Sequence, residues 1–223
     1  MTNDPRVFPL PGLWRPVKKK DLEILLEKVE RHPSPSPRLE QYQTPAAVAA
    51  DVLFWAAQLG DIQGRKVVDL GCGTGILAIG ASLIGAREAV AIDVDEAALG
   101  VAIRNASALG AEVSFLTVDV SEFPESCDTV LMNPPFGAQN AHADRPFLEA
   151  ACRIGRVVYS FHNAPTEAFV LGWFEDRGAA VTHRREFSIP IPRQFDFHRD
   201  EVRPFPVLCL RTEVAPPRAA TEA

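Results

Sequence analysis

The segment Asn133-Pro134-Pro135-Phe136 combines residue types that together could hold a flat group that carries an amine while its nitrogen is attacked. The Asn133 side-chain oxygen and the Pro134 carbonyl can both accept hydrogens from an exocyclic amine. Neither proline has a backbone N–H, and each fixes its own φ, so the turn presents acceptors. Phe136 could stack on the ring that bears the amine. By itself, the segment also fits a proline-rich turn with Phe136 packed inward.

A glycine-rich segment upstream predicts a ligand-binding turn between a strand and a helix. A short apolar run ends in Asp69, and three glycines then alternate with other residues before an apolar run with helical spacing. This G-x-G-x-G pattern is one residue shorter than the turn that cradles a pyrophosphate, so it suits a ligand without phosphates, such as S-adenosylmethionine. The predicted cofactor contacts here are Asp69, Gly71, Gly73, Thr74, Gly75 and Ile76.

Two more acids follow strand-like runs and extend the predicted cofactor site. The run Ala89–Ile92 ends in Asp93, and an acid at the tip of the second strand is where a ribose diol would be bound. Asp119 and Val120 follow a further strand-like run. We expect them to meet the adenine of the cofactor through the carboxylate and the next backbone N–H.

A polar segment leads into the helix predicted before the glycine turn. Thr44 suits the N-cap and Pro45 the first helical position, and the helix would run to about Gly60. Gln41 and Tyr42 exceed what capping requires, so we expect them to close over the cofactor, with Thr44 among its contacts. The apolar face of the helix is predicted to carry Val48, Val52, Trp55 and Leu59.

The order of apolar runs predicts an α/β fold. Strand and helix patterns alternate from Arg65 to about Arg177, which is typical of a parallel sheet. Two later runs, Ala179–Ile189 and Phe205–Thr212, predict an antiparallel strand pair at one sheet edge. This is the usual arrangement of a Rossmann-like class I S-adenosylmethionine-dependent methyltransferase. We expect a leader with an amphipathic helix in residues 1–38, the catalytic domain in 39–212 and a flexible tail in 213–223.

The net charge of −6 argues against a nucleic-acid partner, but its distribution does not. Residues 1–38 carry eight Lys or Arg and five Asp or Glu, whereas residues 39–175 carry seven and seventeen. The basic ends could form a positive rim at the substrate side, or the lysines could merely solvate a helix face. The residues proposed for this rim are Lys18, Lys19, Lys20, Arg193 and Arg199, together with Arg184 and Arg185.

Other sequence features favour a cytoplasmic protein. The chain shows no secretory signal pattern and no apolar run long enough to span a membrane. Its cysteines lack metal-ligand spacing and are expected to stay reduced. These cysteines are Cys72, Cys127, Cys152 and Cys209.

The motifs together resemble the methyltransferase-like protein five family, the adenine-N6 methyltransferases of small-subunit ribosomal RNA in archaea and eukaryotes. The resemblance implies S-adenosylmethionine as cofactor, RNA as substrate and no metal. It also implies a heterodimer with a small zinc-binding activator protein on an apolar sheet edge, for which Ala89–Ile92 and Val113–Val118 are candidates. The matching stretches are Leu39–Thr44, Asp69–Gly75, Ile79–Ala81, Ile92–Asp95, Asp119–Val120, Met132–Gly137 and Val158–His162.

The expected mechanism is a direct in-line methyl transfer, in which the two acceptors favour a tetrahedral nitrogen and alignment with the methyl carbon supplies much of the rest. The proton on nitrogen becomes acidic only once the methyl is added, so no strong base is required. His162 is therefore expected either to line the substrate pocket or to be a satisfied structural histidine.

Three rival interpretations fit parts of the pattern. A glutamine-N5 methyltransferase of translation factors holds the amide of its substrate in the same way. That family, however, carries Tyr in place of Phe136 and a helical domain before the glycine turn. A DNA adenine methyltransferase would carry a separate target-recognition region, for which this chain has no spare stretch. A non-catalytic binding subunit of the same fold would commonly have lost the glycine turn or the Asn133–Phe136 motif, and both are whole here.

Overall fold

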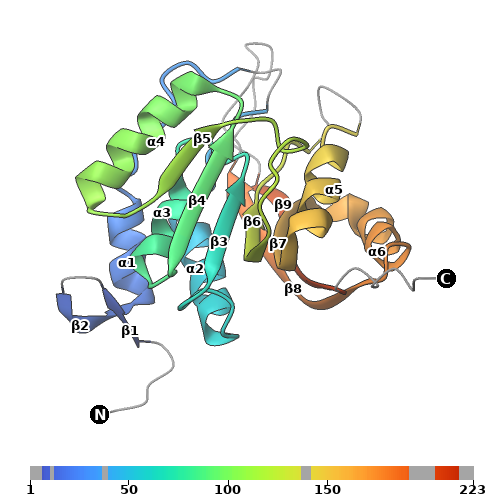
Figure 1. The fold of residues 1–223 in the computed structure, drawn as a ribbon, viewed down its shortest axis with the longest axis horizontal. Helices are drawn as coiled ribbons and strands as arrows, with labels where there is room; N and C mark the ends of the chain where they lie inside the picture. Colours follow the sequence, from blue (N-terminus) through green and yellow to red (C-terminus); the bar gives the residue numbers. More distant parts are fainter. Residues whose placement is uncertain (1–6, 11–12, 37–39, 137–141, 191–203, 216–223) are drawn as a thin grey trace.

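A seven-stranded sheet forms the centre of the protein, seen in a computed structural model that describes residues 7–10, 13–36, 40–136, 142–190 and 204–215 (Figure 1). The strand order is β5-β4-β3-β6-β7-β9-β8. The first five of these strands run parallel, and β9 is antiparallel to both β7 and β8. This arrangement confirms the predicted fold class. The strands are β3 (Lys66–Leu70), β4 (Glu88–Asp93), β5 (Ser114–Thr117), β6 (Cys127–Met132), β7 (Gly155–Asn163), β8 (Ala179–Pro190) and β9 (Pro204–Val214).

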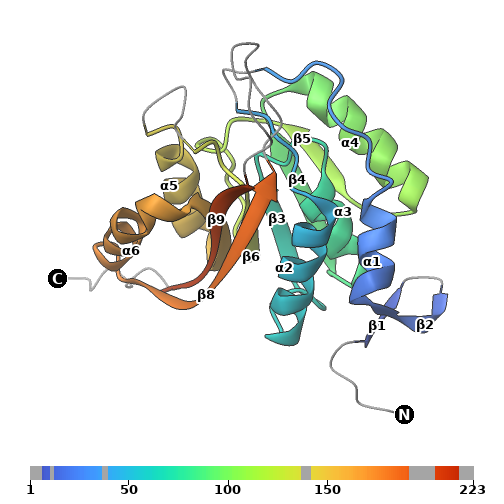
Figure 2. The same ribbon diagram turned by 180° about the vertical axis from the view of Figure 1, so that it is seen from behind.

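Helices cover both faces of the sheet, because successive strand residues point to opposite faces. Val67 of β3 joins the core that includes α1, α2 and α3, whereas Val68 and Leu70 join the core that includes α5 and α6. Figures 1 and 2 show the two layers from opposite sides. The helices are α1 (Lys19–Leu26), α2 (Ala46–Gln58), α3 (Ile76–Leu83), α4 (Glu96–Leu109), α5 (Arg145–Ile154), η2 (Ala164–Thr166, a 3-10 helix) and α6 (Glu167–Glu175). Within the described residues, no helix is both long and apolar enough to cross a membrane.

The amino-terminal segment packs onto the sheet domain. β1 (Val7–Leu10) and β2 (Leu13–Lys18) form an antiparallel hairpin that leads into α1. Leu22 and Leu26 of α1 are buried in the core that α2 and α3 share. Because α1 packs beside α2 (Figure 2), it helps to hold the helix whose amino end reaches the site.

The carboxyl ends of the parallel strands meet at one edge of the sheet. The chain crosses from β3 to β4 and β5 on one side, and β6 and β7 pair on the other side. The strand order therefore reverses between β3 and β6, and open α/β sheets bind their ligands in the crevice at such a switch point. The residues that follow β3, β4 and β6 thus lie at the edge where a site is expected.

Three details of the predicted elements are wrong. α2 begins at Ala46 with Pro45 as its N-cap, so Thr44 does not cap it. Leu59 lies just beyond α2 and is 39% exposed, although its spacing predicts a place on the buried face. β4 lies between β3 and β5, so of the two candidate docking strands only β5 is at the sheet margin.

Candidate active site

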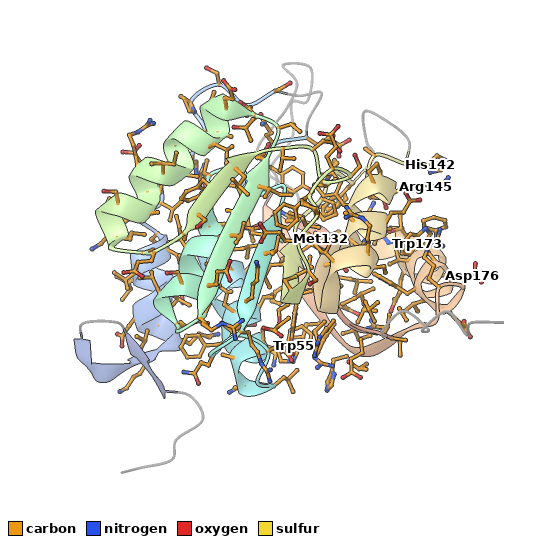
Figure 3. All side chains as sticks on the ribbon, viewed as in Figure 1. Trp55, Met132, His142, Arg145, Trp173 and Asp176 are labelled. Carbon is orange, nitrogen blue, oxygen red and sulfur yellow. The ribbon has the colours of Figure 1, made fainter. Side chains whose placement is uncertain are left out.

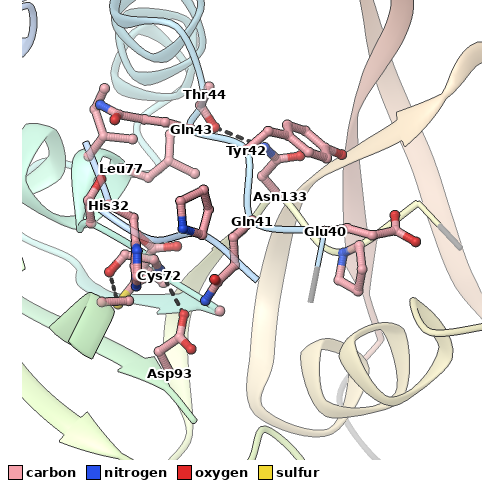
Figure 4. A pocket seen from close by; sticks show the side chains of 18 of the residues that line it. His32, Glu40, Gln41, Tyr42, Gln43, Thr44, Cys72, Leu77, Asp93 and Asn133 are labelled. Carbon is pink, nitrogen blue, oxygen red and sulfur yellow. Dashed lines mark hydrogen bonds between the residues drawn. The ribbon is translucent and has the colours of Figure 1, made fainter. Parts of the chain in front are cut away.

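A pocket of about 980 Å³ opens at the carboxyl ends of the central strands (Figure 4). Of the predicted catalytic residues, Asn133 and Pro135 line it and Pro134 and Phe136 do not, whereas Tyr42 does. Every predicted cofactor contact except Gly75 also lines it. These contacts are Gln41, Thr44, Asp69, Gly71, Gly73, Thr74, Ile76, Asp93, Asp119 and Val120.

The glycine turn between β3 and α3 has the backbone that its sequence predicts. Gly71, Gly73 and Gly75 have φ values of 67°, 53° and 85°, a region that side chains with a Cβ rarely adopt. A Cβ on Gly73 would meet no atom within 4 Å, so the space beside it is open. A Cβ on Gly75 would meet Ala102 at 3.1 Å, and Gly75 does not line the pocket. Gly75 serves the turn and the packing against α4, and its assignment as a cofactor contact stays a prediction.

Three carboxylates face the pocket with different environments. Asp69 is fully buried, and burial raises the pKa of its carboxyl to about 7, although it accepts a hydrogen bond from the Ala78 N–H at 3.0 Å. Asp93 accepts a hydrogen bond from the Gly73 N–H at 2.8 Å, which links the end of β4 to the glycine turn. The Ser121 hydroxyl and N–H donate to Asp119 and lower the pKa of that carboxyl.

These residues fit S-adenosylmethionine. Its ribose hydroxyls and its amino group are hydrogen-bond donors, and the carboxylates of Asp69, Asp93 and Asp119 are acceptors. The open space at Gly73 gives the ligand close access to the backbone.

The segment before α2 closes one side of the pocket and is tied to α4. Gln41 donates from Nε2 to Asp95 Oδ2 at 2.7 Å and accepts the Ser36 N–H at 2.7 Å. Asp95 also caps α4, since its side chain accepts hydrogen bonds from the Ala97 and Ala98 N–H groups. The hydrogen bond from Gln41 lowers the pKa of the Asp95 carboxyl. Gln41 therefore lines the pocket while its amide holds the segment in place.

The turn Asn133–Phe136, called the acceptor turn below, carries an acceptor without a partner. Asn133 donates from Nδ2 to Thr44 Oγ1 at 3.0 Å. Its Oδ1 is buried and accepts no hydrogen bond from the described residues. A buried polar atom without a partner is costly, so a site that keeps one is expected to receive it from a ligand.

Aromatic rings surround the far end of the acceptor turn. The Phe136 ring lies 5.9 Å from that of Phe205 at an interplanar angle of 15°, and 5.3 Å from that of Tyr42 at 51°. Phe136 is half-buried, so part of its surface is exposed to solvent. Burial raises the pKa of the Tyr42 hydroxyl, which keeps it protonated, and the hydroxyl has no partner among the described residues.

Four other predicted substrate contacts that the structure describes do not line the pocket. His162 is 2% exposed, its Nε2 lies 2.7 Å from Ser160 Oγ, and burial lowers its pKa to about 3. It does not line the pocket, so the structural interpretation is the correct one. Lys18, Lys19 and Lys20 lie at the start of α1 and do not line the pocket. Leu26, the last residue of α1, does line it.

The remaining basic residues of the predicted rim divide into two groups. Arg184 pairs with Glu167, and Arg185 pairs with Asp51 and lies over the Trp55 ring at 4.7 Å. Arg193 and Arg199 lie outside the described residues, so their assignment as RNA contacts stays a prediction.

Sequence reasoning missed several residues of the site. Glu40 accepts the Phe136 N–H at 2.7 Å, and Phe147 from α5 and Ile189 from β8 line the pocket. Glu40 lies inside the matching stretch Leu39–Thr44, so the resemblance contained a signal for it. Nothing in the local sequence marks Phe147 or Ile189, because their contacts are formed across the fold.

Comparisons with known proteins agree with this geometry. Residues 49–154 match the methyltransferase small domain family model. The rRNA N(6)-adenosine-methyltransferase Mettl5 of Drosophila melanogaster is 34% identical over 209 residues, covering 89% of this chain and 97% of the relative. A solved structure from Pyrococcus horikoshii, provisionally described as an RNA methyltransferase, is 43% identical with a TM-score of 0.83. The match covers 89% of this chain and 99% of that one.

A more distant structure shares the fold and carries the cofactor. The magnesium protoporphyrin IX methyltransferase of Synechocystis, solved with S-adenosylmethionine bound, has a TM-score of 0.61 and 19% identity over 75% of this chain and 78% of its own. Fold and site thus define an S-adenosylmethionine-dependent class I methyltransferase. Within that class, the chain belongs to the family of the rRNA N(6)-adenosine-methyltransferase Mettl5.

Proposed function

We propose that this protein methylates the N6 amine of an adenine in small-subunit ribosomal RNA. The observation that carries the proposal is the buried Asn133 Oδ1, an acceptor in the pocket with no partner among the described residues. An exocyclic amine donates the hydrogens that this oxygen lacks. The name of the Drosophila relative specifies ribosomal RNA and N6 of adenosine.

The residues of the acceptor turn act by holding the amine. Asn133 Oδ1 and the Pro134 carbonyl accept its two hydrogens, which favours a tetrahedral nitrogen with its lone pair directed at the methyl carbon. Phe136 stacks on the target base, which must be unpaired or flipped out to reach the pocket. S-adenosylmethionine, when bound, supplies a methyl group activated by its sulfonium. The proton leaves nitrogen after the transfer, and His162, which burial keeps neutral, takes no part.

We also propose that a small zinc-binding activator protein forms a heterodimer with this chain along β5. β5 is the terminal strand of the sheet, and Leu116 on it is 42% exposed. An unpaired strand edge offers backbone donors and acceptors to another strand. A chain that is monomeric, soluble and fully active alone on RNA would contradict this part of the proposal.

The test is a transfer assay with labelled S-adenosylmethionine and unmodified small-subunit rRNA, run with and without the activator. Digestion of the RNA to nucleosides identifies the product, and Asn133→Ala serves as the control. We expect N6-methyladenosine at one site, lost in the variant. Label on a translation-factor glutamine with none on RNA would overturn the proposal and favour a glutamine-N5 methyltransferase. Cofactor binding without transfer to either substrate would favour a non-catalytic subunit.

A further inference from the structure

The segment Glu40–Thr44 holds the acceptor turn at both of its ends. At the first end, Asn133 Nδ2 donates to Thr44 Oγ1 at 3.0 Å. At the other end, the Phe136 N–H donates to Glu40 Oε2 at 2.7 Å. The two prolines between them have no N–H to donate. The turn is therefore tied to the segment through a side chain at one end and through the backbone at the other.

The hydrogen bond to Thr44 places the Asn133 amide. Nδ2 donates to Thr44 Oγ1, and Oδ1, on the other side of the amide, is buried without a partner among the described residues. If the amide were rotated by half a turn, its NH₂ group would face the hydrogens of the incoming amine, and donor would oppose donor. A correctly oriented amide is thus a condition for holding the amine.

The backbone around Glu40 is shaped for the second contact. Glu40 has a φ of 49°, which is uncommon for a residue with a side chain, and only 7% of its surface is exposed. The Tyr42 N–H donates to the Glu40 carbonyl at 2.9 Å, which closes a tight turn. Strained conformations of this kind persist where the surroundings hold them, and they cluster at functional sites.

We propose that Thr44 and Glu40 are positioning residues for the methyl transfer, in which Thr44 holds the Asn133 side chain and Glu40 anchors the backbone at Phe136. This inference rests on the proposed function and adds residues to that same site. It also changes the role of Thr44, because its hydroxyl serves the acceptor turn, whereas the sequence pattern assigned it to the cofactor.

The first experiment replaces the Thr44 hydroxyl without changing the shape of the side chain. In Thr44→Val, the single-turnover rate at saturating cofactor and RNA should fall about ten- to a hundredfold, as misplacement of a reacting group does. The dissociation constant for S-adenosylmethionine should stay within about twofold, because the loss is in orientation. Thr44→Ser restores the hydroxyl and should recover most of the rate. Thr212→Val is the matched control, since Thr212 is fully buried on β9 and does not line the pocket.

A second measurement needs no catalysis. The side-chain NH₂ signals of Asn133 in ¹⁵N-labelled protein are identified by their loss in Asn133→Ala. We expect slow hydrogen exchange in the wild type and in Thr44→Ser, and exchange at least about tenfold faster in Thr44→Val, because an amide N–H without an acceptor is no longer protected. Unchanged exchange in Thr44→Val would overturn the role of Thr44.

The Glu40 contact is tested by a matched pair of variants. Glu40→Gln keeps a side-chain oxygen that can accept the Phe136 N–H, whereas Glu40→Ala removes it. We expect the single-turnover rate of Glu40→Ala to fall at least about fivefold below that of Glu40→Gln, with equal cofactor binding. Equal rates in the two variants would overturn the role of Glu40. This pair and Thr44→Ala carry the test if Thr44→Val does not fold.

Failure of the inference and failure of the proposed function give different results. A weaker cofactor affinity in Thr44→Val, with a normal rate at saturation, would show that Thr44 contacts the cofactor and would overturn its positioning role. A wild-type protein that leaves RNA unmethylated but protects the Asn133 amide would overturn the proposed substrate. In that case the hydrogen bond that orients Asn133 would stand.

Discussion

Two buried carboxylates, Asp61 in the segment before β3 and Asp69 within β3, have opposite environments. Asp61, just before β3, accepts hydrogen bonds from the Tyr159 hydroxyl at 2.6 Å and from Arg211 Nε at 2.8 Å. Asp69, within β3 near the pocket, accepts a hydrogen bond from a backbone N–H and has no cation beside it among the described residues. Figure 3 places Trp55, which packs edge-on against Tyr159, well below Met132, the residue before the acceptor turn.

The difference separates a structural region from a functional one. The Asp61 carboxylate accepts hydrogen bonds from Tyr159 and Arg211. Arg211 also donates to Thr182 Oγ1 and to Glu213. In the pocket, Asn133 Oδ1, Tyr42 OH and Gln43 Oε1 are buried without partners among the described residues. Unpaired buried groups cost stability, so their concentration where ligands bind indicates that ligands complete them.

The largest expected effect is on stability, at Asp61. Asp61→Ala leaves the buried Arg211 guanidinium without its main partner, which should lower the free energy of unfolding by about 3–5 kcal/mol. Urea unfolding measures this change. Asp51→Ala is the matched control, because Asp51 pairs with Lys19 at a partly exposed position and should cost less than about 1 kcal/mol. Equal losses in both variants would remove the distinction between the two regions.

The next effect is on catalysis, at Asn133. Asn133→Ala removes the acceptor and should lower the single-turnover rate about 10²- to 10³-fold, with little change in unfolding free energy. Calorimetric titration of S-adenosylmethionine should show retained affinity. Asn163→Ala is the control, since Asn163 Oδ1 is also buried without a described partner but lies outside the pocket. A comparable loss of rate in that control would argue for a general structural effect.

A smaller effect is expected on RNA binding, at Phe136. Loss of the ring in Phe136→Ala should raise the KM for RNA by the equivalent of about 1–3 kcal/mol, because stacking on the target base is lost. Phe136→Tyr keeps the ring and should stay within about threefold of the wild type. If Phe136→Ala lowered only the melting temperature, the ring would serve its packing against Phe205 and Tyr42 alone.

The last effect is a gradual pH dependence of stability from Asp69. Burial raises its pKa from 3.8 to about 7, so between these values the unfolded state loses the proton while the folded state keeps it. The contribution of Asp69 to stability is therefore fully present below about pH 4 and is lost as pH rises toward 7. Relative to Asp69→Asn, the wild type should lose about 1.4 kcal/mol between about pH 5 and pH 6. Parallel pH profiles of the two proteins would show that Asp69 has no such shift.

Much of the fold and half of the site follow from local sequence. The predicted strand Ala179–Ile189 matches β8 (Ala179–Pro190) to within one residue, and the three glycines of the glycine turn have positive φ values. Apolar periodicity determines which runs become parallel strands, and the carboxyl ends of such strands meet at one edge. The acids after the strands can therefore be assigned to one pocket from the sequence.

The errors share one cause. The sequence pattern predicts that Thr44 caps α2, but its hydroxyl accepts from Asn133, 89 residues away. Leu59 has a spacing typical of the buried face of α2, but it lies just beyond the helix and is 39% exposed. Local sequence does not encode such choices, because a polar atom bonds to whichever partner the fold brings within reach.

The order of strands and helices, the glycine turn and the chemical types at the carboxyl edge of the sheet can be predicted from the amino-acid sequence. These properties depend on backbone preferences and on apolar spacing, both of which are local. The contacts by which Glu40 and Thr44 hold the acceptor turn, and the pairing of Asp61 but not Asp69 with a cation, appear only in the folded protein. Those outcomes depend on distances between residues far apart in the chain, and packing alone sets such distances.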